Sequence, residues 1–400
     1  MISVCRLKNS IMDYAWGSRT AIPELMGKKA PSDVPQAELW MGAHPKAPSM
    51  VLWRKNWASL PDLIDRYPQE ILGASAVQRF GRTLPFLFKI LAAEKPLSIQ
   101  AHPNRMQAET GFKRENRHRI PIDAVHRNYK DNNHKPECLC ALTPFRALKG
   151  FRPVPEILKN FDIFFPDEFD DVKHVLLMRE SREALKYMFE RVTALEASRK
   201  ETLVAHAVAR TPDDPGQTAV SEWMRRLYRE YPKDAGVLSP IFLNLVCLQP
   251  GEAVYLPAGE LHAYLQGTAI EVMANSDNVL RGGLTNKHID VNELIQVLTF
   301  DSGPVYPLVP RCVTPSATVY DCPAAEFSLA CIQVDDRTSY ESGRDRNVEI
   351  LLCTKGRAVI RTTKGHEGMP ITGGDSVLIP AGVIRYGITG NAVFYKAYVP

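Results

Sequence analysis

A twelve-residue pattern occurs twice in this chain, 123 residues apart, and it constrains the fold more than any other feature. The copies are Gly251-Glu-Ala-Val-Tyr-Leu-Pro-Ala-Gly-Glu-Leu-His262 and Gly374-Asp-Ser-Val-Leu-Ile-Pro-Ala-Gly-Val-Ile-Arg385. Each copy predicts a turn, then a short strand, and then a Pro-Ala-Gly turn that ends strand pairing and directs the last side chain inward. Because the period is the size of a domain, the chain contains two related β units and is not a solenoid.

The two copies differ at the residue that ends them. His262 can bind a metal ion, whereas Arg385 cannot. The frame Gly-x5-Pro-x-Gly-x2-His of the first copy resembles the second motif of the cupin superfamily, whose barrels are jelly rolls. We therefore expect two cupin β-barrels, of which the first holds a metal ion and the second holds none.

A helical segment separates two strand-rich parts of the chain. Apolar residues at helical spacing predict helices over 181–192 and 220–231, and shorter helices over 59–65 and 291–298. Short apolar runs predict strands over 83–93, 97–102 and 241–248. The fold class is mainly β, and the helical block is either an insertion in the β scaffold or a layer against it.

Composition excludes several classes of partner. The chain has 49 basic and 45 acidic residues among 400, so its net charge of +4 is too small to favour nucleic acid or an anionic membrane. No apolar run has the length of a membrane span, and the first twenty residues lack a signal-peptide core. Eight cysteines without a CxxC pair predict reduced thiols. We expect a cytoplasmic monomer whose partner is a small molecule.

Four side chains are candidates for metal binding. Gln100 and His102 are two residues apart, so both leave the same face of a strand. His262 supplies a third donor, and Glu137, at the entry to an apolar strand, supplies a fourth. Oxygen and nitrogen donors without thiolate suit Zn²⁺, and they would also accept Mn²⁺, Co²⁺ or Fe²⁺.

Longer motifs give a closer resemblance, to the type I phosphomannose isomerases. They lie on both sides of the helical segment and are Tyr14-Ala-Trp-Gly-Ser18, Glu38-Leu-Trp-Met-Gly42, Pro96-Leu-Ser-Ile-Gln-Ala-His-Pro103, His134-Lys-Pro-Glu137, Gly259-Glu-Leu-His-Ala-Tyr264 and Asn275-Ser-Asp-Asn-Val-Leu-Arg-Gly-Gly-Leu-Thr285. The resemblance implies an enzyme that interconverts D-mannose 6-phosphate and D-fructose 6-phosphate and that feeds mannose and GDP-mannose metabolism. It implies an α-helical domain inserted in the metal-bearing half, so the expected domains are the first part of the catalytic cupin (1–152), the helical insertion (153–238), the rest of the catalytic cupin (239–318) and a C-terminal cupin without metal (319–400). It also implies one zinc ion per chain, and it makes Gln100, His102, Glu137 and His262 the ligands and Arg281 the active-site arginine.

An aldose–ketose isomerase must open the sugar ring and move a proton between C1 and C2 through a cis-enediol. Lys135 is our candidate for this acid–base step, because its charged form is disfavoured beside a dication. An exposed loop lysine is the alternative. His134 alternates with Lys135 along the chain, so its side chain points the other way, and we expect it to assist the proton transfer or to orient the groups that carry it out. The family pattern suggests Asp277, together with the ligand His102, for ring opening, although Asp277 is equally suited to cap a turn.

Three side chains are candidates for the phosphate group of the substrate. Arg281 precedes two glycines and offers a forked donor for phosphate or enediolate, with a structural salt bridge as the alternative. Ser98 shares the strand face of Gln100 by parity, and Lys89 lies on the preceding strand.

Other functions remain open from the residues alone. The principal alternative is a non-catalytic cupin that binds metal and sugar phosphate, but such a protein would need neither Lys135 nor Arg281. An iron-dependent cupin oxygenase is disfavoured by the glutamine donor. A bifunctional isomerase–guanylyltransferase is disfavoured because the chain shows no nucleotidyltransferase signature and is short for two activities.

Overall fold

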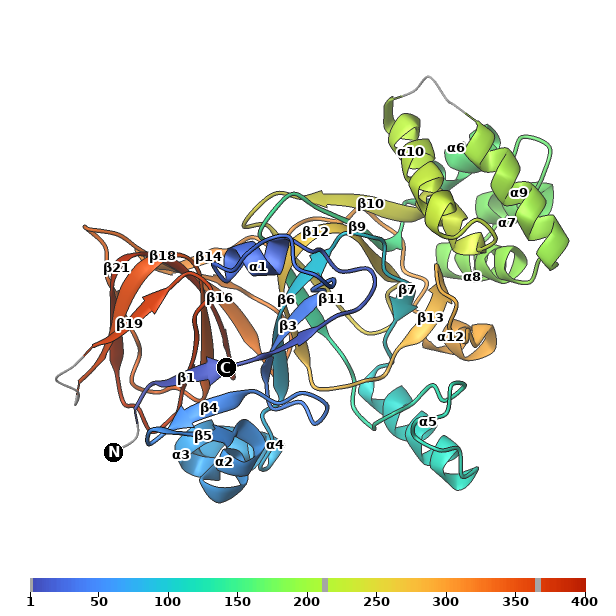
Figure 1. Cartoon of the computed structure of the whole chain (residues 1–400). Helices are drawn as coiled ribbons and strands as arrows, with labels where there is room; N and C mark the ends of the chain where they lie inside the picture. Colours follow the sequence, from blue (N-terminus) through green and yellow to red (C-terminus); the bar gives the residue numbers. More distant parts are fainter. Residues whose placement is uncertain (1–2, 211–214, 364–367) are drawn as a thin grey trace.

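The computed structural model describes residues 3–210, 215–363 and 368–400, and most of its architecture consists of two large sheets. Figure 1 shows one sheet, mostly orange and red, at one end of the molecule, a group of helices at the other end, and the second sheet between them. The predicted mainly β architecture, with a helical block between two groups of strands, is confirmed. The closure of each sheet into a jelly-roll barrel stays a prediction.

The central sheet has ten antiparallel strands and contains every strand that carries a predicted metal ligand. Its longest path runs β10-β9-β12-β6-β3-β2, while β7, β8, β11 and β13 pair beside it. The strands are β2 (Ser10–Met12), β3 (Glu38–Gly42), β6 (Phe86–Ala93), β7 (Ile99–Ala101), β8 (Glu137–Ala141), β9 (Phe145–Phe151), β10 (Leu243–Leu248), β11 (Ala253–Leu256), β12 (His262–Ala274) and β13 (Leu280–Gly283).

The second sheet has eleven strands and combines both ends of the chain. Its order is β14-β15-β16-β21-β18-β20-β1-β4-β5, with β17 on β21 and β19 on β18. The strands are β1 (Cys5–Lys8), β4 (Met50–Trp53), β5 (Asn56–Ser59), β14 (Arg311–Thr314), β15 (Ala317–Tyr320), β16 (Ser328–Val334), β17 (Tyr340–Glu341), β18 (Glu349–Thr362), β19 (Met369–Thr372), β20 (Ser376–Ile379) and β21 (Tyr386–Tyr398). Because β1, β4 and β5 join this sheet, the N-terminal segment contributes to both sheets. The domain boundaries themselves stay a prediction.

Most of the helices lie in two groups, one after β5 and one between β9 and β10 (Figure 1). Single helices lie between β2 and β3 (α1), after β7 (α5) and after β13 (α12). The helices are α1 (Ala21–Leu25), α2 (Leu60–Arg66), α3 (Pro68–Leu72), α4 (Ala74–Phe80), α5 (Arg105–Arg117), α6 (Val154–Phe164), α7 (Asp170–Met178), α8 (Ser181–Thr193), α9 (Ala197–Ala209), α10 (Pro215–Glu230), the 3₁₀ helix η1 (Ala235–Leu238), α11 (Ser239–Phe242) and α12 (Val291–Val297). Within the described residues no helix is both long and apolar enough to cross a bilayer.

Several predicted elements begin at other residues than the pattern indicated. The strand predicted over 241–248 begins at Leu243, because Ser239-Pro240 starts the helical turn α11. The helix predicted from 220 begins at Pro215. The helix predicted from 181 does begin there, as α8.

Two apolar cores hold the site strands in place. Ile99 of β7 and Leu280 of β13 pack in one cluster with Phe161 and Met224 of the helical block. Phe88 and Ile90 on β6, and their neighbours, pack in another cluster with Leu329, Ile350 and other apolar residues of the eleven-stranded sheet. The helices therefore support the strands β7 and β13, and the second sheet covers the far face of β6.

Both copies of the repeat form the predicted turn–strand–turn. β11 and β20 occupy the same positions of the pattern, and Gly251 and Gly374 take nearly the same φ, +89° and +90°. The outcome differs at the end of the pattern. His262 is buried, but Arg385 is exposed, and Tyr386 is the side chain that turns inward. The inward direction predicted for Arg385 is therefore wrong, because the second turn delays the start of β21 by one residue.

Replacing Gly251 by alanine should lower the free energy of unfolding by roughly 1–2 kcal/mol, because an L residue at this φ brings its Cβ close to a backbone oxygen. Apart from the residue itself and its two chain neighbours, nothing lies within 4 Å of the new Cβ. The cost is therefore local backbone strain and not a clash with packed side chains. Gly343→Ala is the matched control, since its site is equally open but its φ lies outside the left-handed region. Chemical denaturation measures the free energy of unfolding of both variants. Equal losses would contradict a conformational cost that is specific to the positive φ of Gly251.

Candidate active site

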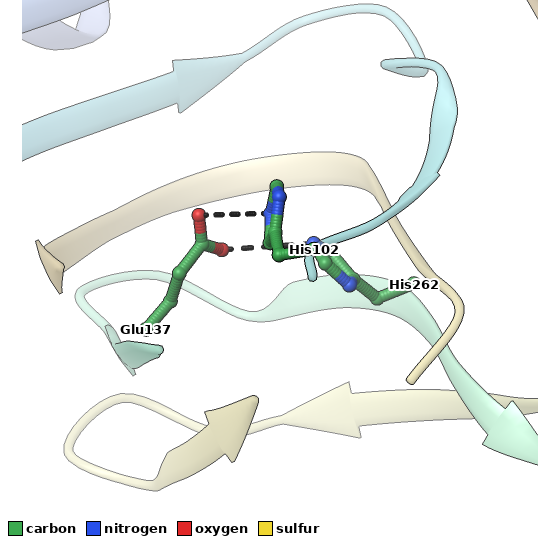
Figure 2. Close-up of side chains that lie close together, drawn as sticks. All are labelled: His102, Glu137 and His262. Carbon is green, nitrogen blue, oxygen red and sulfur yellow. Dashed lines mark ion pairs between the residues drawn. The ribbon is translucent and has the colours of Figure 1, made fainter. Parts of the chain in front are cut away.

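Three strands of the central sheet bring the predicted metal ligands together. His262 is the first residue of β12 and pairs in register with Gln100 of β7. His102 follows β7 directly, and Glu137 opens β8, where Pro136 marks the start of the strand. Figure 2 shows the carboxylate of Glu137 facing both imidazole rings. Ligands that are far apart in the sequence thus meet because their strands begin or end at one place.

The distances within this cluster suit a shared cation. His102 Nε2 lies 3.2 Å from Glu137 Oε1, and His262 Nε2 lies 3.6 Å from Glu137 Oε2. One donor atom from each of the three residues can be chosen so that all lie within 4.8 Å of one another. All three side chains are only 1% exposed. Such burial leaves the donors without competing water.

Backbone carbonyls fix the orientation of both rings. His102 Nδ1 lies 2.8 Å from the carbonyl of Asn278, and His262 Nδ1 lies 3.1 Å from the carbonyl of Glu260. A carbonyl can only accept, so each Nδ1 carries the proton and each Nε2 is left as a lone pair facing Glu137. This is the arrangement in which outer hydrogen bonds orient histidine ligands of metals.

Electrostatics set the protonation of the cluster as a metal site requires. Burial is the largest effect on both histidines and lowers the pKa of each, that of His262 to about 4. Burial alone would raise the pKa of Glu137, but the nearby Lys135 and His102 lower it to well below its usual range. Two neutral imidazoles therefore flank one carboxylate.

Gln100 completes the predicted set. Its Nε2 lies 3.3 Å from His262 Nε2, and rotating the amide by 180° would present Oε1 instead. His102 Nε2 is buried and has no hydrogen-bond partner within the described part of the chain. An unpartnered buried lone pair, a buried carboxylate and a neighbouring amide fit a divalent cation such as zinc.

A second layer of charge supports Glu137. The hydroxyl of Tyr264 donates to Glu137 Oε2 and is also 3.0 Å from Glu271 Oε1. Glu271 in turn pairs with Lys89 at 3.0 Å, and Glu38 lies 3.7 Å from the same lysine. Burial lowers the pKa of Lys89, but Glu271 and Glu38 together raise it above its ordinary value, so it stays charged.

A cavity of about 530 Å³ adjoins this cluster, and Glu137 and Gln100 line it, whereas His102 and His262 are not among its lining residues. Seven of the residues singled out from the sequence face it: Lys89, Ser98, Gln100, Lys135, Glu137, Asp277 and Arg281. Lys135 Nζ lies 3.1 Å from Glu137 Oε1, so the lysine is buried at the site and is not an exposed loop residue.

Two cations in this cavity have no acidic partner. Neither Arg281, on β13, nor Lys287 forms an ion pair with any residue that the structure describes. Burial, followed by the proximity of Arg281 and two other cations, lowers the pKa of Lys287. The structural salt bridge considered for Arg281 is therefore not formed among the described residues. The positive charges of Arg281 and Lys287 are both available to an anion.

Asp277 lies at the rim of the cavity between two cationic or donor groups. Lys46 Nζ is 2.8 Å and His44 Nε2 is 3.6 Å from its carboxylate. Burial alone would raise the pKa of the Asp277 carboxyl, but His44 and Lys46 together outweigh that effect, so its pKa lies below the ordinary value. His44 Nδ1 accepts from the backbone N–H of Lys46, so Nε2 carries the proton.

His134 lies apart from the other predicted residues. Its Nε2 is 2.7 Å from Glu326 Oε1, which also pairs with Arg105 of α5. It is not among the residues that line the cavity. Because His134 and Lys135 alternate, the two side chains point in opposite directions.

Sequence reasoning missed five residues near the site, namely Glu38, His44, Tyr264, Glu271 and Lys287. Tyr264 has the strand parity of His262, and Glu271 is paired in register with Lys89, so both follow once the strand pairing is known. His44 and Lys287 lie in loops, where no periodicity signals their direction.

Lys89→Met should lower the free energy of unfolding by about 3–5 kcal/mol, because it leaves two buried carboxylates without their counter-charge. Lys95→Met is the control, since it removes a surface pair with Glu230 that contributes less than about 1 kcal/mol. Urea denaturation of metal-free protein measures both. Equal losses would show that the buried network is not charged as described.

Comparisons with known proteins agree with this geometry. A model of the phosphomannose isomerase type I catalytic domain matches residues 4–154. The chain is 40% identical to the mannose-6-phosphate isomerase of Escherichia coli K12 over 398 residues, which cover 98% of this chain and 99% of the relative. It is 32% identical to the human mannose-6-phosphate isomerase over 403 residues, covering 94% and 93% of the two chains.

Solved structures give the same result. A crystal structure of a mutant of phosphomannose isomerase from Salmonella typhimurium superposes with a TM-score of 0.91 at 37% identity, over the full length of both chains. A zinc-bound crystal structure of mannose 6-phosphate isomerase does so with a TM-score of 0.90, also at 37% identity and full coverage of both chains. The chain belongs to the type I phosphomannose isomerase family.

Proposed function

We propose that this protein is a zinc-dependent aldose–ketose isomerase that interconverts D-mannose 6-phosphate and D-fructose 6-phosphate. The observation that carries the proposal is the convergence of two neutral imidazoles on one buried carboxylate, Glu137, which lines a cavity that also holds acid–base groups and cations without an acidic partner among the described residues. The relatives named mannose-6-phosphate isomerase, and the neighbour whose title names bound zinc, support this substrate and this metal.

His102, Glu137 and His262 would hold the zinc ion, with Gln100 as a further ligand. When bound, the cation stabilises the negative charge that develops on the sugar oxygens at C1 and C2. The ligand set carries one negative charge, so the site keeps a net positive charge after binding a dication. That charge favours an anionic transition state.

Arg281 and Lys287 are the groups that we assign to the anionic parts of the substrate. Neither has an acidic partner among the described residues, so substrate would meet no competing carboxylate. Lys89 differs, because Glu271 and Glu38 already balance its charge. We therefore assign Lys89 and Ser98 to hydroxyl or phosphate oxygens as hydrogen-bond donors, and the main charge compensation to Arg281.

Lys135 is the group that we assign to the proton transfer. Its Nζ lies beside the ligand Glu137, so it reaches the same oxygens that the cation stabilises. In its neutral form it would remove the proton from C2 of mannose 6-phosphate, and the electrons of that bond would form the cis-enediolate. The ammonium of Lys135 would then deliver a proton to C1 while the hydroxyl proton on O2 moves to O1, giving fructose 6-phosphate without a redox cofactor.

Asp277 is assigned to ring opening. His44 and Lys46 hold it as a carboxylate, the form that accepts the proton of the anomeric hydroxyl. His134 would act only through its neighbour Lys135, because its ring is bound to Glu326. We therefore regard His134 as a positioning residue.

The alternative of a non-catalytic metal- and sugar-phosphate-binding cupin fits the site less well. Storage or binding needs the three ligands and a cation for phosphate. It does not need a buried lysine beside a ligand or a second cavity-lining carboxylate that is held ionised.

We also propose a cytoplasmic location and a monomeric state. All eight cysteines are free thiols, and most are buried, which suits a reducing compartment. Size-exclusion chromatography with light scattering measures the oligomeric state directly.

Chelation should abolish conversion of mannose 6-phosphate to fructose 6-phosphate, and Zn²⁺ should restore it. His262→Ala should lose most of the bound metal and at least 100-fold in activity, since removal of one ligand opens the site. His118→Ala, in an exposed loop, is the control and should keep both. A coupled assay with metal analysis of the same sample measures these outcomes. Full turnover by metal-stripped protein would overturn the mechanism.

Lys135→Met should keep zinc but lose exchange of the C1 and C2 protons by 100-fold or more, a loss at the scale of general acid–base catalysis. Lys130→Met is the matched control, because Lys130 lies in the same loop and its ammonium contacts only a backbone carbonyl. Proton NMR in D₂O measures the exchange. If Lys135→Met exchanged at the wild-type rate, another base would have to be assigned.

A further inference from the structure

Two loops that carry candidate catalytic groups are joined by the side chain of one buried residue, Asn278. Residues 118–136 connect α5 to β8 without helix or strand, and they contain Lys135. Residues 275–279 connect β12 to β13 in the same irregular way, and they contain Asp277. Because no helix or strand hydrogen bonds fix these loops, their positions depend on side-chain contacts.

The amide group of Asn278 uses its hydrogen-bonding capacity on the 118–136 loop. Its Oδ1 accepts from the backbone N–H groups of Lys130, at 2.7 Å, and Asp131, at 3.2 Å. Its Nδ2 donates to the backbone carbonyls of Asp131 and Asn133, each at 2.9 Å. Backbone N–H groups can only donate and carbonyls can only accept, so these four partners fix the orientation of the amide. Asn278 is completely buried, which keeps water from competing for these bonds.

Asp131 binds in the opposite direction, from the 118–136 loop to the 275–279 loop. Its Oδ2 accepts from the backbone N–H of Asp277 at 2.7 Å, and its Oδ1 accepts from the hydroxyl of Ser276 at 2.9 Å. Oδ1 also accepts from Asn278 Nδ2 at 3.2 Å. Each loop therefore holds the backbone of the other with a side chain of its own.

The backbone of Asn278 connects this pair of loops to the metal ligands. Its carbonyl accepts from His102 Nδ1 at 2.8 Å. Asn278 thus contacts a proposed metal ligand through its carbonyl and the loop of Lys135 through its amide, and it directly follows Asp277 in the chain. A shift of either loop would move a candidate acid–base group relative to the metal ligands.

We propose that Asn278 is a positioning residue, which fixes Lys135 and Asp277 relative to the metal site. The inference rests on the proposed function, in which Lys135 transfers the proton and Asp277 opens the ring. Asn278 is not among the residues that line the cavity, so it acts through its neighbours and not on the substrate. Proton transfer requires the base within hydrogen-bond reach of its target, and a displacement of about 1 Å can cost about 100-fold in rate.

Asn278→Ala tests the proposal, with turnover divided by bound zinc so that unfolded protein does not contribute. For mannose 6-phosphate, kcat per zinc should fall about 100-fold while KM changes less than about threefold, because the lost contact affects the reaction step and not substrate binding. An amide with only a structural role would lower the stability but leave kcat per zinc unchanged.

Asn160→Ala is the matched control. Asn160 lies on α6 in the helical block, is 1% exposed and donates from its amide to the carbonyl of Ile241. Its loss removes a comparably buried amide that contacts neither catalytic loop. Urea denaturation should show reduced stability of Asn160→Ala, and its kcat per zinc should equal that of the wild type.

Asp131→Asn tests the same contact from the other loop, and it decides the question if Asn278→Ala does not fold. The wild-type carboxylate accepts from four donors, including the backbone N–H of Asp277, whereas the amide keeps one accepting oxygen. We expect kcat per zinc to fall about 10-fold with KM unchanged. Adding Asp131→Asn to Asn278→Ala should lower kcat little further, because both changes break one contact between the loops.

Turnover per zinc equal to that of the wild type in both variants would overturn the proposal. This includes a loss of activity that only follows the loss of zinc, since Asn278 would then support the metal site alone. Losses that multiply in the double variant would also overturn it, because the two residues would act independently. Failure of the proposed function is a different result, in which neither the zinc-bound wild type nor Asn160→Ala converts mannose 6-phosphate.

Discussion

The buried carboxylate of Glu137 is the interaction on which the rest of this site depends. It is the one anionic ligand in the cluster, and it contacts two imidazoles, Lys135 and the hydroxyl of Tyr264. A lone buried carboxylate would be protonated, because burial disfavours charge. The ammonium group of Lys135 keeps Glu137 ionised. The same contact places the candidate base beside the proposed metal ligand, so one ion pair sets both the charge of Glu137 and the position of Lys135.

The same constraint explains the charge pattern behind the ligands. Tyr264 connects Glu137 to Glu271, and two carboxylates so close would repel each other if neither were compensated. Lys89 supplies that compensation, and it is buried on the strand that pairs in register with β12. Charge balance therefore keeps Lys89 from being a free cation. Arg281 has no acidic partner in the part of the chain that the structure describes, which supports the phosphate-binding role that we propose for it.

Much of the site could be predicted from the sequence, because its key residues lie on strands. Parity placed Gln100 and His102 on one face of a strand, and the repeat directed His262 inward from its turn. In the structure Gln100 lies on β7, His102 follows β7 directly, and His262 opens β12 opposite Gln100. The direction of His134 and the environment of Asp277 depend on loops that contact Glu326 and His44, and no periodicity encodes such contacts. The pairing of β1, β4 and β5 with the C-terminal sheet was also missed, since sequence patterns predict strands but not their partners.

The two β units show how a repeat can keep its backbone while its chemistry changes. The glycine turn and the short strand occupy equal positions in both copies, because left-handed φ and strand pairing act on the backbone. The side chain that follows is not constrained in this way. A shift of one residue at the start of β21 leaves Arg385 in solvent and turns Tyr386 inward. A metal ligand is thereby exchanged for a hydroxyl donor to a buried carboxylate, so the second unit can retain a polar interior without a metal.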